Sequence, residues 1–443
     1  MGRSGGIYLR YLGGYERTTT SDTDRWSNHI RLLDLGWGAV DYLSTCLSTG
    51  AQGLLASIRY CPRSLFALSK PIYTEGRQRS RFQAFSAPSS STRQKHTASP
   101  ALMDPKLKRI IELIESKKKS SLPWKRQERH DQPYYTYSPE TTSWDAVSPS
   151  STPSKAMPSS PPPTKFSIMS WNIDFMLPFT SERMLAALNH LHSLITSNPH
   201  PTIIMLQEML ESDLLLIQSQ PWLRKQYNLT DISADHWESG HYGTVTLIPK
   251  SLPVASVFRV HYEATVMERD ALFVDLAVAP SQTTIRICNT HLESLIANPP
   301  KRPAQLATAA KFMHDPAVAG AVLGGDLNAI QDFDRTLHSD NDLSDAYLTL
   351  GGREDSDEGY TWGQMAPTKQ RQMFGCSRMD KLFFCGQLQC EKFERFGLGI
   401  KAEDKHVQES LVQDEGMEEG WVTDHLGVSA EFSIVQTQAE PKI

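Results

Sequence analysis

Residues 165–436 predict an α/β fold in which two sheets pack together and helices flank them. Short apolar runs alternate with turn residues along this stretch, as strands and loops do. Many of the runs are continuously apolar, which is typical of strands buried between two layers. A sizeable core is also compatible with the composition, because 39% of the 443 residues are hydrophobic and 21% are charged.

The apolar runs predict eight strands and two helices. The expected strands are Phe166–Ile173, Thr202–Glu208, Gly243–Ile248, Leu272–Val278, Ile285–Thr290, Ala321–Gly324, Lys381–Phe384 and Gly427–Phe432. Apolar residues recur at helical spacing between the first two strands, at Met184, Leu188, Leu191 and Ile195. A second helix is expected over Pro303–Met313.

The residues before this domain divide into three stretches. Residues 1–103 are rich in Arg and Ser with little periodicity, which predicts a disordered extension or a targeting segment. Residues 104–119 predict a short amphipathic helix that Asp104 can cap, with Pro105 in its first position. Residues 120–164 are rich in Ser, Thr and Pro, so a linker is expected, although the aromatic residues at 134–137 suggest that part of it packs on the domain.

Several classes of protein are disfavoured. The six cysteines form no CxxC pair, which argues against a disulfide framework or a zinc site. No run of 18 apolar residues occurs, so we expect no membrane partner. Residues 1–100 carry a net charge of +7, which leaves the rest acidic within a total of −5 and argues against broad, non-specific coating of DNA.

Polar residues follow or precede the expected strands, where loops present chemistry on a rigid scaffold. Each feature alone is weak, since an isolated Asp-x-Asn is most often a turn and an isolated His is most often structural. Together they form a set of carboxylates, carboxamides and imidazoles: Asn172, Glu208, His291, Asp326, Asn328, Asp380, Asp424 and His425.

This set suits the hydrolysis of a phosphodiester. Carboxylate oxygens are the ligands that Mg²⁺ prefers, and the cation offsets the negative charge that develops at phosphorus. The reaction also needs a group that accepts a proton from water and donors for the phosphoryl oxygens. No thiolate or imidazole-rich set is present, which disfavours a zinc mechanism.

The motifs resemble those of the endonuclease/exonuclease/phosphatase superfamily in order and spacing. They are Ser170-Trp171-Asn172, Leu206-Gln207-Glu208, Thr290-His291-Leu292-Glu293-Ser294, Gly325-Asp326-Leu327-Asn328, Arg378-Met379-Asp380 and Thr423-Asp424-His425. Within the superfamily, Trp171-Asn172-Ile173-Asp174 and Tyr360-Thr361-Trp362 are most similar to the tyrosyl-DNA phosphodiesterase 2 family. The resemblance covers residues 165–436 and implies a four-layered α/β/β/α sandwich.

The resemblance also implies roles for these residues. Glu208 would bind Mg²⁺ directly, or Mn²⁺ in its place, with Asn172 and Asp424 beside it. Asp326 would handle the proton and Asn328 would orient the water or the phosphate. His425 and His291 would contact the phosphoryl oxygens, with Asp380 fixing the tautomer of His425. The residues expected to line the substrate path are Tyr242, Ser294, Arg302 and Trp362.

The resemblance favours an enzyme that hydrolyses 5′-phosphotyrosyl bonds in the repair of topoisomerase adducts. Its partner would be DNA with a blocked 5′ end, single-stranded or frayed, and the enzyme would act as a monomer. Such work implies a nuclear location, and the Arg- and Ser-rich N-terminus leaves mitochondria as an alternative. The rival readings are an abasic-site endonuclease, an RNA exonuclease, an inositol or sphingolipid phosphatase, or a non-catalytic binding module.

Overall fold

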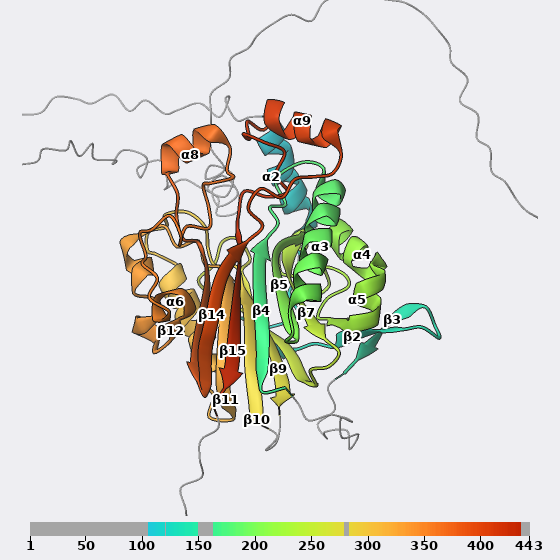
Figure 1. Ribbon diagram of the computed structural model, residues 1–443, viewed down its shortest axis with the longest axis vertical. Helices are drawn as coiled ribbons and strands as arrows, with labels where there is room; N and C mark the ends of the chain where they lie inside the picture. Colours follow the sequence, from blue (N-terminus) through green and yellow to red (C-terminus); the bar gives the residue numbers. More distant parts are fainter. Residues whose placement is uncertain (1–104, 120, 149–162, 279–282, 436–443) are drawn as a thin grey trace, which may run out of the picture. The chain divides into compact units, whose positions relative to one another are not determined.

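Two β-sheets lie face to face with helices on their outer faces (Figure 1). The structure is a computed structural model that describes residues 105–119, 121–148, 163–278 and 283–435. Helices α3 (Thr180–Ser197), α4 (Glu211–Ser219) and α5 (Pro221–Gln226) cover one sheet, and α6 (Arg302–Met313) covers the other. The expected α/β/β/α sandwich is therefore confirmed.

Each sheet is mixed, with one parallel pair of strands near its middle. The seven-stranded sheet runs in the order β1 (Arg129–Asp131), β8 (Val254–His261), β9 (Asp270–Val278), β10 (Thr283–Thr290), β11 (Val318–Asp326), β13 (Asp380–Gly386) and β12 (Ser344–Asp345). The eight-stranded sheet runs β14 (Leu388–Phe396), β15 (Gly427–Ile434), β4 (Lys165–Asn172), β5 (Thr202–Leu210), β7 (Tyr242–Pro249), β6 (Tyr227–Leu229), β2 (Tyr134–Ser138) and β3 (Ser143–Val147). The parallel pairs are β4 with β5 and β10 with β11.

Further helices lie outside these layers. They are α2 (Pro105–Lys117), α7 (Ala346–Thr349), α8 (Thr368–Phe374), α9 (Lys405–Gln413) and the short 3₁₀ turns η2 (Asp332–Arg335) and η3 (Ser339–Asn341). All eight expected strands and the three expected helices are present. The strands that the sequence pattern did not predict include β8 and β14. Strand β14 lacks a continuous apolar run, because several of its residues are exposed polar ones.

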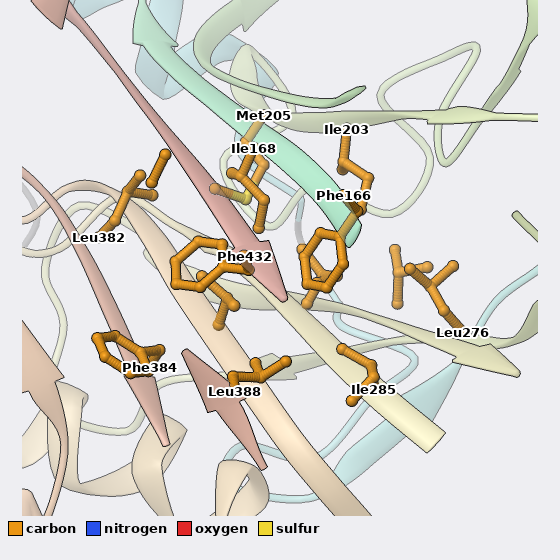
Figure 2. Close-up of a cluster of buried hydrophobic side chains, with 14 of the residues drawn as sticks. Phe166, Ile168, Ile203, Met205, Leu276, Ile285, Leu382, Phe384, Leu388 and Phe432 are labelled. Carbon is orange, nitrogen blue, oxygen red and sulfur yellow. The ribbon is translucent and has the colours of Figure 1, made fainter. Parts of the chain in front are cut away.

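The central core fills the space between the sheets (Figure 2). Phe166 and Ile168 of β4 meet Leu276 of β9 and Ile285 of β10 there, and all four are buried. On the opposite face of β4, Met169 and Trp171 pack with the helices instead. Strand β4 is thus buried on both faces, which explains why its sequence is almost continuously apolar.

A crossover helix connects each parallel pair, because parallel neighbours cannot be joined by a tight turn. Helix α3 connects β4 to β5, and α6 connects β10 to β11. The carboxyl ends of these four strands carry most of the candidate polar residues. The sandwich therefore gathers them at one edge of the two sheets.

The stretch 120–164 is not a linker throughout, since it contributes three strands. Strand β1 pairs with β8 in one sheet, while β2 pairs with β6 in the other. The aromatic ring of Trp144 in β3 explains part of this order, because its Nε1 donates a hydrogen bond to the Gln218 carbonyl at 3.2 Å. The aromatic residues noted in the sequence therefore do pack on the domain. The strands were not predicted because the surrounding residues are rich in Ser and Pro.

The expected extension of residues 1–103 lies outside the described residues. Within the part of the chain that the structure describes, no helix has both the length and the apolar composition needed to cross a bilayer.

Candidate active site

The candidate residues meet at the edge where the two sheets present their strand ends. Asn172 ends β4 and lies opposite Gln207 of β5, next to Glu208. Asp326 ends β11 and lies opposite Asp380, the first residue of β13. These register positions are separated by many residues in sequence, and the sheets bring them together.

The Asn172 carboxamide links the two sheets. Its Nδ2 donates to Glu208 Oε1 at 3.2 Å and to Asp326 Oδ2 at 3.1 Å. Its Oδ1 accepts from the backbone N–H of Asp174 at 2.9 Å. The backbone carbonyl of Asn172 accepts from Thr423 Oγ1 at 2.9 Å. Every polar atom of this buried side chain is therefore engaged, which fixes the separation of the two carboxylates.

A bulge in β5 directs Glu208 into the site. The register with β7 shifts between Leu206 and Met209, and Glu208 itself has φ 61°. Such bulges change the direction of a side chain, and they are common beside active sites. Glu208 Oε2 accepts from the Phe175 N–H at 3.0 Å, and burial raises the pKa of Glu208 to about 7 although the charge of Arg269 opposes the shift.

His425 is held as a cation among carboxylates. Its Nδ1 lies 2.9 Å from Asp380 Oδ2, while its Nε2 lies 3.8 Å from Asp326 Oδ2 and 3.7 Å from Asp424 Oδ1. Although burial alone would lower it, the pKa of His425 is raised well above its ordinary value by Asp380, Asp424 and Asp326. His425 and His291 in turn lower the pKa of Asp326, against the effect of its burial.

His291 is neutral, with a defined tautomer. Arg269 Nη1 lies 2.8 Å from His291 Nδ1, and since a guanidinium can only donate, Nδ1 is the acceptor and the proton sits on Nε2. That Nε2 lies 3.4 Å from Asp326 Oδ2. Burial and the charge of Arg269 lower the pKa of His291 well below its ordinary value. The two imidazoles therefore carry different charges on either side of Asp326.

The turn after β11 presents Asp326 and Asn328 together. The Asn328 N–H donates to Asp326 Oδ1 at 2.8 Å, and its Nδ2 donates to the Leu292 carbonyl at 3.1 Å. Gly325 precedes the turn with φ 146°, and a Cβ there would lie 1.7 Å from the Thr290 carbonyl oxygen. Only glycine allows β11 to approach β10 this closely where the site begins.

These side chains open into one cavity of about 450 Å³. Glu208, His291, Asp326, Asn328, Asp424 and His425 line it, together with the expected residues Ser294 and Trp362. The Trp362 Nε1 donates to Asp424 Oδ2 at 2.7 Å, which places its ring in the wall. Asn172 and Asp380 lie behind the lining residues and support them.

Tyr242 and Arg302 do not line this cavity. Tyr242 lies behind Phe175, with the two rings stacked at 4.3 Å, and it is Phe175 that faces the cavity. Arg302 is buried and makes a two-pronged ion pair with Asp334, at 2.9 Å and 2.8 Å. It also donates to the carbonyls of Glu293 and Leu295. The guanidinium of Arg302 thus holds the loop that carries Ser294, and its expected contact with substrate stays a prediction.

The sequence reasoning missed other residues that line the cavity. Arg269 was not considered, and no sequence signal marks it, because its importance depends on its contact with His291. Asp174 did have a signal, two residues after Asn172. Its carboxylate is buried, Oδ2 has no hydrogen-bond partner among the described residues, and its pKa is raised well above the ordinary value by burial and by the charges of Asp424 and Glu208.

The crowding of Asp174, Glu208 and Asp424 suits a bound cation. Burial and the charges of Asp424 and Glu208 raise the pKa of Asp174 although the charge of Arg183 opposes the shift, and a divalent ion with hard oxygen ligands would offset these like charges. A second group, Asp326, Asp380 and His425, offers ligand atoms within 4.8 Å of one another. We favour the first group, because His425 in the second bonds to Asp380 through Nδ1 and its raised pKa favours the protonated ring, which has no lone pair for a metal.

The comparison with known families agrees with this geometry. A sequence model of the Endonuclease/Exonuclease/phosphatase family matches residues 169–425, which span every candidate residue named above. The chain belongs to this family. Members of the Endonuclease/Exonuclease/phosphatase family are divalent-metal-dependent phosphodiesterases, so the expectation of such an enzyme is confirmed at the level of the family.

Individual relatives are more distant. The 5′-tyrosyl-DNA phosphodiesterase of Caenorhabditis elegans is 27% identical over 232 residues, which are 51% of this chain and 59% of that relative. A humanized TDP2 of D. rerio aligns over 61% of this chain and 100% of its own, with 19% identity and a TM-score of 0.47. Truncated C. elegans TDP2 aligns over 61% and 97% with 23% identity and a TM-score of 0.46.

Proposed function

We propose that this chain is a magnesium-dependent phosphodiesterase that hydrolyses 5′-phosphotyrosyl bonds on DNA in the repair of topoisomerase adducts. The observation that carries the proposal is the placement of Asp326 between a cationic His425 and a neutral His291 at the edge of the cavity. The likeness to the C. elegans 5′-tyrosyl-DNA phosphodiesterase supports the substrate class.

In the proposed reaction, the oxygen of a water attacks phosphorus and the bond between phosphorus and the tyrosyl oxygen breaks. Asp326 accepts the proton of the water, since its lowered pKa keeps it a carboxylate. His425 and the Nε2–H of His291 donate to the phosphoryl oxygens, and Asn328 orients the attacking water. The tyrosyl oxygen leaves as a phenolate and is protonated by solvent.

The metal would be held by Glu208, with Asn172, Asp174 and Asp424 beside it. When bound, Mg²⁺ supplies a charge that offsets the negative charge developing on the phosphoryl oxygens, and Mn²⁺ can substitute for it. The Phe175 N–H and the Asn172 carboxamide fix the Glu208 carboxylate for this purpose.

The cavity wall favours an unpaired DNA end. Trp362 and Phe374 both line the cavity, with ring centroids 6.4 Å apart, and Phe374 is 56% exposed. Exposed aromatic rings stack on unpaired bases, so we propose a single-stranded or frayed 5′ end bound by a monomer. A TDP2 of D. rerio has been solved with a single-stranded DNA product. A nuclear location follows from the proposed work, and a fluorescent fusion of the full chain that remains outside the nucleus would contradict it.

The proposal is tested with a short oligonucleotide that carries a 5′-phosphotyrosyl end. The full chain with Mg²⁺ should release a 5′-phosphate product within minutes, and EDTA or Asp326→Asn should abolish the release. If an abasic duplex or plain RNA is cleaved instead, the family chemistry stands and the proposed substrate is wrong. No cleavage of any phosphodiester, with Mg²⁺ or Mn²⁺, would favour a non-catalytic binding role.

A further inference from the structure

A segment outside the family-matching region runs along the outside of the active-site wall. We call residues 118–119 and 121–127, which follow α2, the strap. At its start, Lys118 Nζ lies 2.5 Å from Glu268 Oε1, and the Glu268 side chain is only 9% exposed. The next residue, Lys119, donates to the carbonyls of Ala234 and Asp235 at 3.0 Å and 2.5 Å. These contacts join the strap to loops far away in sequence.

The other end of the strap is also anchored. The Trp124 ring stacks on the His261 ring with centroids 4.1 Å apart and planes 11° apart. Arg126 donates to the Tyr262 carbonyl at 2.8 Å and forms an ion pair with the buried Glu238. The Gln127 N–H donates to the His261 carbonyl at 2.8 Å. The strap therefore contacts both ends of the loop formed by residues 262–269.

That loop delivers Arg269 to the site. Glu268, which Lys118 holds, is the residue directly before Arg269 and has φ 53°, a conformation that costs about 1 kcal/mol or more and persists only where neighbours enforce it. The adjoining Met267 carbonyl accepts from the Tyr242 hydroxyl at 3.3 Å. A contact that fixes Glu268 therefore also fixes the direction in which Arg269 leaves the loop.

Arg269 borders a small cavity in addition to the main one. A cavity of about 20 Å³, enough for about one water molecule, is bordered by Glu238, Glu268, Arg269 and His291. A displacement of Arg269 that accompanies relaxation of the loop would break the 2.8 Å contact between Arg269 Nη1 and His291 Nδ1. His291 would then lose the partner that fixes its Nε2–H toward Asp326.

We propose that the strap is a positioning element for catalysis, in which the Lys118–Glu268 ion pair holds Arg269 against His291. The inference rests on the proposed function, because its consequence is read in the rate of phosphodiester cleavage. Lys118 touches no reacting atom and acts through Glu268 and Arg269. The pKa of Lys118 is consistent with a specific pair, since Glu268 raises it against the lowering effect of partial burial.

The test compares Lys118→Ala with Lys108→Ala, which removes an exposed lysine of α2 that pairs with Glu112 at 3.7 Å. In the full chain, Lys118→Ala should lower kcat on the phosphotyrosyl oligonucleotide about five- to twentyfold, the effect of losing about 1–2 kcal/mol of positioning. KM should change less than twofold, because the strap does not line the cavity. Lys118→Arg, and the charge-reversed pair Lys118→Glu with Glu268→Lys, should recover most of the rate.

A second readout needs no substrate. Amide hydrogen exchange across residues 262–270 should quicken in Lys118→Ala and stay at the wild-type rate in Lys108→Ala. Inactive wild-type protein would count against the proposed function alone, since the exchange measurement would still report on the strap. Wild-type kcat and unchanged exchange in Lys118→Ala would overturn the inference. So would a loss of rate that neither Lys118→Arg nor the reversed pair restores.

Discussion

The Nδ1 atom of His425 lies 2.9 Å from a carboxylate oxygen of Asp380, and both side chains are buried. This contact fixes the orientation of the imidazole and stabilises its charged form. It also leaves Nε2 pointing toward Asp326 and the cavity. A substitution of nearly equal shape at Asp380 can therefore measure what its negative charge contributes to catalysis.

Asp380→Asn should lower kcat by about 10³- to 10⁴-fold with little change in KM, because an Asn in that place favours the wrong tautomer. Removing the carboxylate also lowers the pKa of His425, so the alkaline limb of the rate profile should move to lower pH. Steady-state kinetics from pH 5 to 9 measure both effects. Asp145→Asn, an exposed carboxylate on β3, is the control, and an unmoved alkaline limb in Asp380→Asn would refute the role given to His425.

Glu208→Gln should remove the response to metal while the fold survives. A Gln keeps an oxygen for the Phe175 N–H but lacks the charge that binds Mg²⁺. Wild-type Tm should rise as millimolar Mg²⁺ is added, because a ligand that binds only the folded state stabilises it. The Tm of the variant should stay level and its turnover should largely disappear. Glu182→Gln, exposed in the first turn of α3, should behave like wild type, and a full Mg²⁺ response in Glu208→Gln would mean that the metal lies elsewhere.

Arg302→Met should destabilise the protein without a specific effect on substrate. It leaves Asp334 buried without its partner, which costs about 3–5 kcal/mol when one member of a buried ion pair is removed. Urea unfolding should show this loss of stability. The KM of the folded variant should stay within about twofold of wild type. Lys311→Ala on the same helix should change stability by no more than about 0.5 kcal/mol. A large rise in KM with normal stability would restore Arg302 to the substrate path.

Asp213 should make the protein less stable as pH rises. Burial raises its pKa to about 6, against the effects of the Leu210 N–H and Arg183. Since the folded state binds this proton more tightly than the unfolded state, the contribution is complete below about pH 4 and is lost as pH rises through about 6. The free energy of unfolding should fall by about 1–3 kcal/mol over this range.

In Asp213→Asn the Leu210 N–H keeps an acceptor but the titration is gone. The variant should therefore gain stability relative to wild type between pH 4.5 and pH 7.5, as measured by urea unfolding at each pH. Asn in place of the exposed Asp235 is the matched control. An equal difference between Asp213→Asn and wild type at both pH values would show that burial does not perturb this carboxylate.

Patterns within the chain predicted the sandwich and marked the strand ends that meet at one edge of it. Asn172, Glu208 and Asp326 were recognisable because each follows an apolar run, and strands buried on both faces have only their ends free for chemistry. The ion pair of Arg302 could not be foreseen, because its partners Asp334 and Gln331 lie about 30 residues away and no local pattern relates them. Arg269 was missed for the same reason, since its contact with His291 exists only once the loop between β8 and β9 has folded back.

Strands β1 and β2 belong to one short segment, yet they close different sheets. A chain that began after residue 148 would keep every residue of the candidate site but would uncover the backbone of β8 in one sheet and of β6 in the other. Unpaired strand edges recruit strands from other molecules, so the shortened protein should aggregate in addition to losing the strap. Removal of residues 128–148 should therefore be limited by solubility, whereas removal of the strap should also lower the rate.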